Sequence, residues 1–138
     1  MRQPRAEAAP PPTPVQQAAG GKTVLVVEDE DVVRGLVRQV LQGAGFEVLV
    51  ARDGEEAYVL AKRHHIDVLL TDLRMPNVGG RELAERLRAS HPALKVVFMS
   101  GYSGSGILSD GVLPPGTAFL EKPFTFSELT GNVQGLLD

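Results

Sequence analysis

Residues 23–29, Thr-Val-Leu-Val-Val-Glu-Asp, form a short apolar run that leads directly into two acidic side chains. The next residues, Asp31 to Gln42, carry apolar side chains at helical spacing, and Gly43 and Gly45 end that pattern. An apolar run followed by a helical pattern then recurs toward the C-terminus. The runs are nearly continuous rather than alternating, which is typical of strands covered on both faces. The sequence therefore predicts an α/β fold with a doubly wound parallel sheet.

The other elements follow from the same two patterns. Asp53 with Glu56, and Thr125 with Glu128, have the spacing of capping boxes at helix starts. The segment 100–116 holds five glycines and a Pro-Pro pair, so we expect the fourth helix to be short or irregular, near 105–110. We expect strands at 46–51, 67–71, 94–99 and 117–120, and helices at 53–64, at 80–90 and from 125 to the end.

Composition excludes several classes of protein. The 138 residues suit one domain, and the net charge of −3 offers no basic field for direct nucleic-acid binding. The chain has no cysteine, hence no disulfide or thiolate site. No apolar run approaches the ~20 residues of a membrane helix, so we expect a cytoplasmic protein without membrane contact. Residues 1–21 have the composition of a Pro/Ala-rich disordered linker or tail, which leaves 22–138 as the folded domain.

Polar side chains follow four of the predicted strands. Glu28-Asp29 follow the first strand, Asp72 the third and Ser100 the fourth, while Lys122 lies just after the fifth. The carboxyl ends of parallel strands share one crevice, where several carboxylates repel one another unless a cation offsets them. An all-oxygen set suits Mg²⁺, with Mn²⁺ as the alternative. An aspartate beside such a metal and a lysine can attack phosphorus, which makes Asp72 the candidate acceptor.

Four motifs in this order resemble those of response regulator receiver domains. They are Val-Leu-Val-Val-Glu-Asp-Glu at 24–30, Leu-Leu-Thr-Asp-Leu-Arg-Met-Pro at 69–76, Val-Phe-Met-Ser-Gly-Tyr at 97–102 and Phe-Leu-Glu-Lys-Pro-Phe at 119–124. The resemblance covers 22–138. It implies a (βα)5 flavodoxin-like sandwich whose five parallel strands have the order 2-1-3-4-5.

The resemblance also implies a role for each motif residue. Asp72 is the phosphoacceptor, Ser100 the switch hydroxyl, Lys122 the salt-bridge partner of the phosphoryl group, and Phe119 the aromatic that moves inward. Glu28 replaces the commoner aspartate, and we expect it to reach the metal through water. Pro123 is expected to follow a cis peptide bond. The implied metal ligands are Glu28, Asp29, Asp72 and the backbone carbonyl of Arg74.

Two large side chains stand where the family controls access of water to the phosphoryl group. These are Arg74 and Tyr102, two positions after the acceptor and two after the switch serine. We expect both to obstruct water and so to lengthen the life of the phosphoryl group. The opposite effect remains open for Arg74, because its charge could instead stabilise the transition state of hydrolysis.

These features predict a phosphoacceptor domain of a two-component phosphorelay, supplied by a histidine kinase or a histidine phosphotransfer protein. On its own it is not expected to be an enzyme, and we expect a monomer. The linker, with no output domain after Asp138, favours the C-terminal receiver of a hybrid sensor histidine kinase over a stand-alone regulator. A phosphorylation-independent interaction domain of the same fold is the main alternative. A metal-dependent aspartyl phosphatase is disfavoured, because Arg74 occupies the place of its second acid.

Overall fold

A parallel sheet of five strands forms the centre of the computed structural model, which describes residues 21–74, 78–101 and 115–137. The sheet order is β3-β2-β4-β5-β6, which in chain order is 2-1-3-4-5, as predicted. Every neighbouring pair is parallel, with Val24 opposite both Val48 and Val68. The strands are β2 (Thr23–Val27), β3 (Glu47–Ala51), β4 (Val68–Asp72), β5 (Lys95–Ser100) and β6 (Thr117–Glu121).

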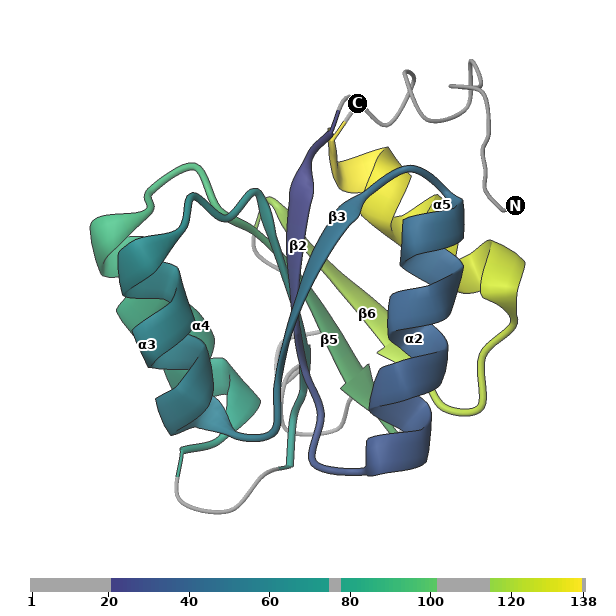
Figure 1. Cartoon of the computed structure of the whole chain (residues 1–138). Coiled ribbons are helices and arrows are strands. Elements are labelled where there is room, and N and C mark those ends of the chain that lie inside the picture. The colour runs from purple at the N-terminus through teal and green to yellow at the C-terminus, as the bar shows by residue number, and fades with distance from the viewer. Residues whose placement is uncertain (1–20, 75–77, 102–114, 138) are drawn as a thin grey trace, which may run out of the picture.

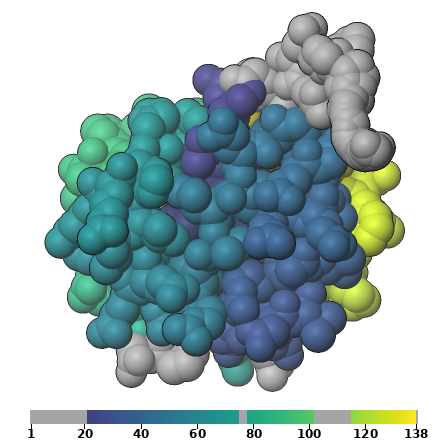
Figure 2. Space-filling model, viewed as in Figure 1, coloured from purple at the N-terminus to yellow at the C-terminus, as the bar shows by residue number. Residues whose placement is uncertain are grey.

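Helices cover both faces of the sheet. In Figure 1, α3 and α4 lie together on one face and α2 and α5 on the other. In the space-filling view from the same side, α3 and α2 flank the edge strand β3, most of which stays at least partly exposed (Figure 2). The described helices are α2 (Asp31–Gly43), α3 (Gly54–Arg63), α4 (Gly80–Ser90) and α5 (Phe126–Leu137). None of them is long and apolar enough to cross a membrane.

The inner strand β2, which lies between β3 and β4, explains why apolar runs are continuous in this sequence. Val24 and Val26 belong to the core beneath α2 and α5, whereas Leu25 and Val27 belong to the core beneath α3 and α4. All four side chains are fully buried. Because successive strand residues point to opposite faces, a strand buried on both sides has no polar position.

Local signals set the helix boundaries. Thr125 and Glu128 form the predicted capping box, in which each side chain accepts a hydrogen bond from the other residue's amide. Asp53 caps α3 by accepting a hydrogen bond from the amide of Glu56. The Glu56 carboxylate accepts from the amide of Arg52 rather than from that of Asp53, so the predicted capping box of Asp53 and Glu56 is incomplete. Gly43 and Gly45 were predicted to end the first helix, and α2 does end at Gly43.

Two predictions about local structure fall outside the described residues. These are the linker, of which only Gly21 is described, and the irregular helix near 105–110. The predicted bounds of the other elements agree with the structure to within one or two residues.

Candidate functional site

The site lies where the carboxyl ends of the strands meet. Glu28 directly follows β2, Asp72 ends β4, Ser100 ends β5, and Lys122 follows β6. Main-chain hydrogen bonds hold these ends in register: the Lys122 amide donates to the Ser100 carbonyl at 2.8 Å, and the Leu73 amide donates to the Met99 carbonyl at 2.9 Å. The predicted convergence of polar residues therefore follows from the strand order.

Three carboxylates form the centre of the site. One oxygen from each of Glu28, Asp29 and Asp72 lies within 4.8 Å of the others, and no other such group of potential ligands occurs in the described parts of the chain. Glu28 is fully buried, Asp72 is largely buried and Asp29 is exposed. The cluster is thus held by the protein on one side and reached by solvent through Asp29.

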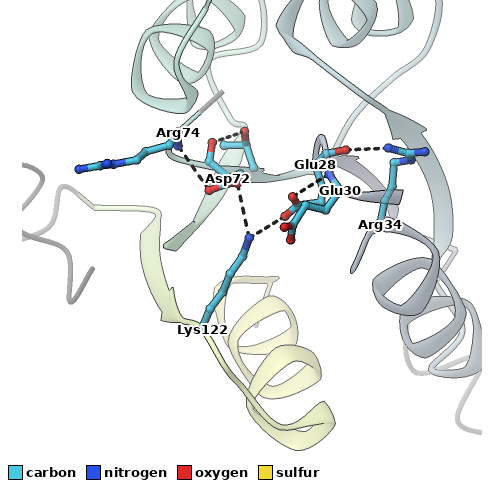
Figure 3. A network of polar contacts seen from close by, with 7 residues as sticks. Glu28, Glu30, Arg34, Asp72, Arg74 and Lys122 are labelled. Atoms are coloured by element: carbon cyan, nitrogen blue, oxygen red, sulfur yellow. Dashed lines mark hydrogen bonds and ion pairs between the residues drawn. The ribbon is translucent and has the colours of Figure 1, made fainter. Parts of the chain in front are cut away.

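Lys122 connects two of these acids. Its Nζ donates to Oε1 of Glu28 at 2.9 Å and to Oδ2 of Asp72 at 3.4 Å (Figure 3). Its side chain is half-buried. The sequence pointed to Lys122 as a partner of a phosphoryl group, but it gave no sign of the ion pair with Glu28.

Burial and charge shift the pKa values of this pair. Burial raises the pKa of Glu28 above its ordinary value, although the hydrogen bond from Lys122 and the one from the Glu30 amide oppose that shift. Burial lowers the pKa of Lys122, but the hydrogen bond and charge of Glu28, followed by the charge of Asp72, outweigh it, so the pKa is raised overall. Lys122 is therefore a charged ammonium at neutral pH.

Both carboxylate oxygens of Glu28 already have protein partners. Oε1 accepts from Lys122, and Oε2 accepts from the Glu30 amide at 3.1 Å. This arrangement is compatible with contact to a metal through water, as expected for the longer side chain, and that role stays a prediction. The exposed Asp29 is better placed to offer an oxygen directly.

Arg34 on α2 is a residue of this site that sequence reasoning missed. Its guanidinium donates to the backbone carbonyl of Glu28 at 2.9 Å (Figure 3), and it also pairs with Asp31. It therefore fixes the turn that carries Glu28 and Asp29. The available signal was a basic residue on the first turns of a helix that directly follows an acidic pair.

The backbone of Arg74 contacts the acceptor, but its side chain does not. Its amide donates to Oδ1 of Asp72 at 3.3 Å, while its side chain is exposed and extends away from Lys122 (Figure 3). Its carbonyl as a metal ligand stays a prediction. Tyr102 lies outside the described residues.

The remaining predicted residues lie on β5, β6 and the loop after it. Ser100 is buried, and Phe119 is partly buried against the core beneath α3 and α4, opposite Phe98 on β5. The peptide bond between Lys122 and Pro123 is cis, as predicted. Their roles in switching stay predictions.

The donor set fits a hard divalent cation. All three candidate ligands are carboxylates, which Mg²⁺ and Mn²⁺ prefer over the nitrogen and sulfur ligands of softer metals. Exposure of Asp29 leaves room for the water ligands that Mg²⁺ usually retains. Glu28, Asp29 and Asp72 would hold such an ion.

Comparison with known proteins agrees with this geometry. The family model described as "Response regulator receiver domain" matches residues 24–134. The chain belongs to this family. It is accordingly a receiver domain of two-component signalling, and its acidic cluster is consistent with a phosphoacceptor site.

The relatives of this receiver domain occur in two settings. It is 34% identical over 122 residues to the sensor kinase CckA of Brucella abortus, covering 87% of this chain but only 13% of that protein. It is 31% identical to the response regulator receiver protein CpdR of the same organism, covering 84% of this chain and 97% of CpdR. Similar domains therefore occur both within a large kinase and as nearly whole proteins.

Two solved structures share this fold and are at least 30% identical in sequence to this chain. The receiver domain of the hybrid histidine kinase CckA has a TM-score of 0.72 and 36% identity, covering 84% of this chain and 99% of that chain. The response regulator TrrA of Thermotoga maritima, solved in complex with Mg²⁺-BeF, has a TM-score of 0.72 and 30% identity, covering 83% of this chain and 98% of that chain.

Proposed function

We propose that this receiver domain accepts a phosphoryl group on Asp72 from a phosphohistidine, with Mg²⁺ as cofactor and Mn²⁺ as a substitute. The observation that carries the proposal is the position of Lys122, whose Nζ lies between the carboxylates of Glu28 and Asp72. A lysine held beside an acidic cluster can bind an incoming phosphoryl group while its charge offsets the acids. The TrrA complex with Mg²⁺-BeF supports the same assignment by similarity.

The residues can carry out the transfer as follows. An Asp72 carboxylate oxygen attacks phosphorus, the bond from phosphorus to the donor imidazole nitrogen breaks, and its electron pair leaves with the imidazole. Lys122 already contacts Oδ2 of Asp72, and the Arg74 amide contacts Oδ1, so the acceptor is held in one orientation. Bound Mg²⁺ supplies positive charge that offsets the carboxylates and the transferring group. Lys122 would supply a further positive charge.

Switching would follow from the new charge on Asp72. A phosphoryl group adds about −1.5 to −2 charge and three strong acceptor oxygens. Ser100 ends the strand beside β4, and its carbonyl binds the amide of Lys122, so movement at Ser100 is coupled to the β6 end. Phe119 lies on β6 and is only partly buried, which leaves its side chain room to repack.

The receiver domain offers the donor protein a contact surface next to Lys122. A groove of about 340 Å³ is lined by Val33, Leu36, Lys122, Pro123 and Phe124. On α2, Val32 is 82% exposed and Leu36 45% exposed, so this helix presents two large apolar side chains to solvent. We expect Val32→Ser with Leu36→Ser to slow transfer from a phosphorylated histidine phosphotransfer protein but not from acetyl phosphate. Equal slowing with both donors would contradict this surface.

We favour a hybrid histidine kinase as the setting of this domain. The Pro/Ala-rich composition of residues 1–21 suits a tether between domains, and the CckA receiver is one of the similar solved structures. The similarity to CpdR keeps a stand-alone regulator as the alternative. In either setting the domain would act as a phosphoacceptor rather than as an enzyme on its own.

Intact-mass measurement with acetyl phosphate tests the proposal. The wild-type chain should gain one phosphoryl group with Mg²⁺ and none with EDTA, and Asp72→Asn should gain none. Glu55→Gln, at an exposed acid on α3 outside the cluster, is the control and should label normally. A wild-type chain that never labels would favour the alternative, an interaction domain that works without phosphorylation.

A further inference from the structure

The first residue of α4 lies directly against the main chain of Asp72. A Cβ atom added at Gly80 would be 2.2 Å from the carbonyl oxygen of Asp72 and 3.1 Å from its carbonyl carbon. The Gly80 amide also donates to the Leu73 carbonyl at 3.1 Å. Helix α4 therefore begins in contact with the backbone of the proposed acceptor, and any side chain at this position would force the two apart.

The first residue of α3 has a similar close contact with Val78, which lies on the same connection between Asp72 and α4. A Cβ atom added at Gly54 would be 2.9 Å from Cβ of Val78 and 3.3 Å from its Cγ1. Gly54 and Gly80 are both buried. The start of α4 thus lies against the beginning of this connection, at Asp72, and the start of α3 lies against its end, at Val78.

Backbone conformation does not explain these glycines. Neither Gly54 nor Gly80 lies in the left-handed region, where glycine is favoured, whereas Gly45 does, with φ of 98°. Alanine is a better helix former than glycine, so it would stabilise both helix starts if space allowed. Close approach is the property that only glycine provides here.

We propose that Gly54 and Gly80 are positioning residues for Asp72, and this rests on the proposed function of Asp72 as acceptor. The reason is that the contacts to the Asp72 carboxylate depend on the same stretch of chain. The Arg74 amide that binds Oδ1 lies between Asp72 and α4. A side chain at Gly80 or Gly54 would displace this stretch, and with it the carboxylate that must attack phosphorus in line.

Alanine substitutions with a neighbouring control test the proposal. Gly80→Ala and Gly54→Ala should each slow labelling by acetyl phosphate at saturating Mg²⁺ by roughly tenfold or more, since a misplacement of about 1 Å can cost ~100-fold. Gly79→Ala is the control, because a Cβ there would be 3.5 Å from the nearest atom, an ordinary contact. Rates are measured per folded molecule, with the free energy of unfolding determined separately by urea.

A rescue experiment separates positioning from stability. Val78→Gly removes both side-chain atoms that a Cβ at Gly54 would meet, Cβ at 2.9 Å and Cγ1 at 3.3 Å, so the double variant Gly54→Ala with Val78→Gly should recover the labelling rate. Wild-type rates per folded molecule in both alanine variants, whatever their stability, would overturn the proposal. If Gly80→Ala does not fold, the Gly54 and Val78 pair decides. Absence of labelling in wild type and in Gly79→Ala would instead show that the proposed function itself fails.

Discussion

Lys122 donates a 2.9 Å hydrogen bond to Glu28, although the two residues are 94 positions apart in the chain. The bond connects the residue after the inner strand β2 to the loop after the edge strand β6. Glu28 is fully buried, so this ammonium group is its principal compensation for lost hydration. Loss of the ammonium group would therefore leave a buried carboxylate without its charged partner.

Removal of Lys122 should destabilise the domain through Glu28. We expect Lys122→Met to lower the free energy of unfolding by roughly 3 kcal/mol, the lower end of the cost of leaving a buried charge unpaired, because Lys122 keeps some contact with water. The double variant Lys122→Met with Glu28→Gln should recover most of this loss. Lys22→Met, at an exposed position, is the control. Urea unfolding measures all four chains, and a double variant no more stable than Lys122→Met would refute the explanation.

Metal affinity should depend more on Asp29 than on Glu28. Asp29 is exposed and offers its carboxylate directly, whereas both oxygens of Glu28 are engaged by Lys122 and the Glu30 amide. We expect Asp29→Asn to weaken Mg²⁺ binding by about tenfold or more, and Glu28→Gln to weaken it less. Calorimetric titration compares them, with Glu30→Gln as the control. Equal losses at both positions would rule out the water-mediated role of Glu28.

The sequence predicted the fold and the location of the site for a clear physical reason. Short continuous apolar runs that alternate with helical patterns are typical of parallel strands buried on both faces, and parallel strands place their carboxyl ends at one edge. The convergence of Asp29, Asp72 and Lys122 therefore followed from order along the chain. The capping box of Thr125 and Glu128 was equally readable, because both partners lie within one helical turn.

The contacts that sequence reasoning missed depend on tertiary distance. The ion pair of Glu28 with Lys122 requires knowledge of which side chains turn inward at two strand ends. The contact of Gly80 with the Asp72 carbonyl requires the angle at which α4 leaves the sheet. Neither the direction of these side chains nor the angle of α4 produces a periodic pattern in the sequence. The polar residues at the predicted strand ends therefore did not reveal these two contacts.

Arg34 should matter for the turn that carries the acids. Its guanidinium donates to the Glu28 carbonyl, and loss of a hydrogen bond from a charged donor costs about 1.5–3 kcal/mol. We therefore expect Arg34→Gln to lower the free energy of unfolding by roughly that amount and to weaken Mg²⁺ binding. Arg38→Gln, at an exposed position on the same helix, should stay close to wild type. Identical unfolding curves for the two variants would contradict the role given to Arg34.

The lifetime of the phosphoryl group should shorten when Arg74 is reduced in size. In this structure the Arg74 side chain extends away from Lys122, so the expected obstruction rests on the resemblance to the family. On that basis we expect Arg74→Asn to speed the loss of phosphate after acetyl phosphate is removed, because a smaller side chain leaves water a freer approach to the phosphoryl group. Tyr102→Ala should act in the same direction. Decay is followed by intact mass over time in excess Mg²⁺. Slower decay in Arg74→Asn would show instead that the arginine charge assists hydrolysis.

Borohydride trapping tests the central claim most directly, because it reads out which residue carries the phosphoryl group. Borohydride reduces an acyl phosphate of aspartate to homoserine and leaves free carboxylates unchanged. After treatment with acetyl phosphate and Mg²⁺, peptide mass spectrometry should find homoserine at position 72 and at no other aspartate. Omitting Mg²⁺ should abolish it. Homoserine at Asp29 or Asp31, or a labelled chain without homoserine at position 72, would contradict the assignment of Asp72 as the phosphoacceptor.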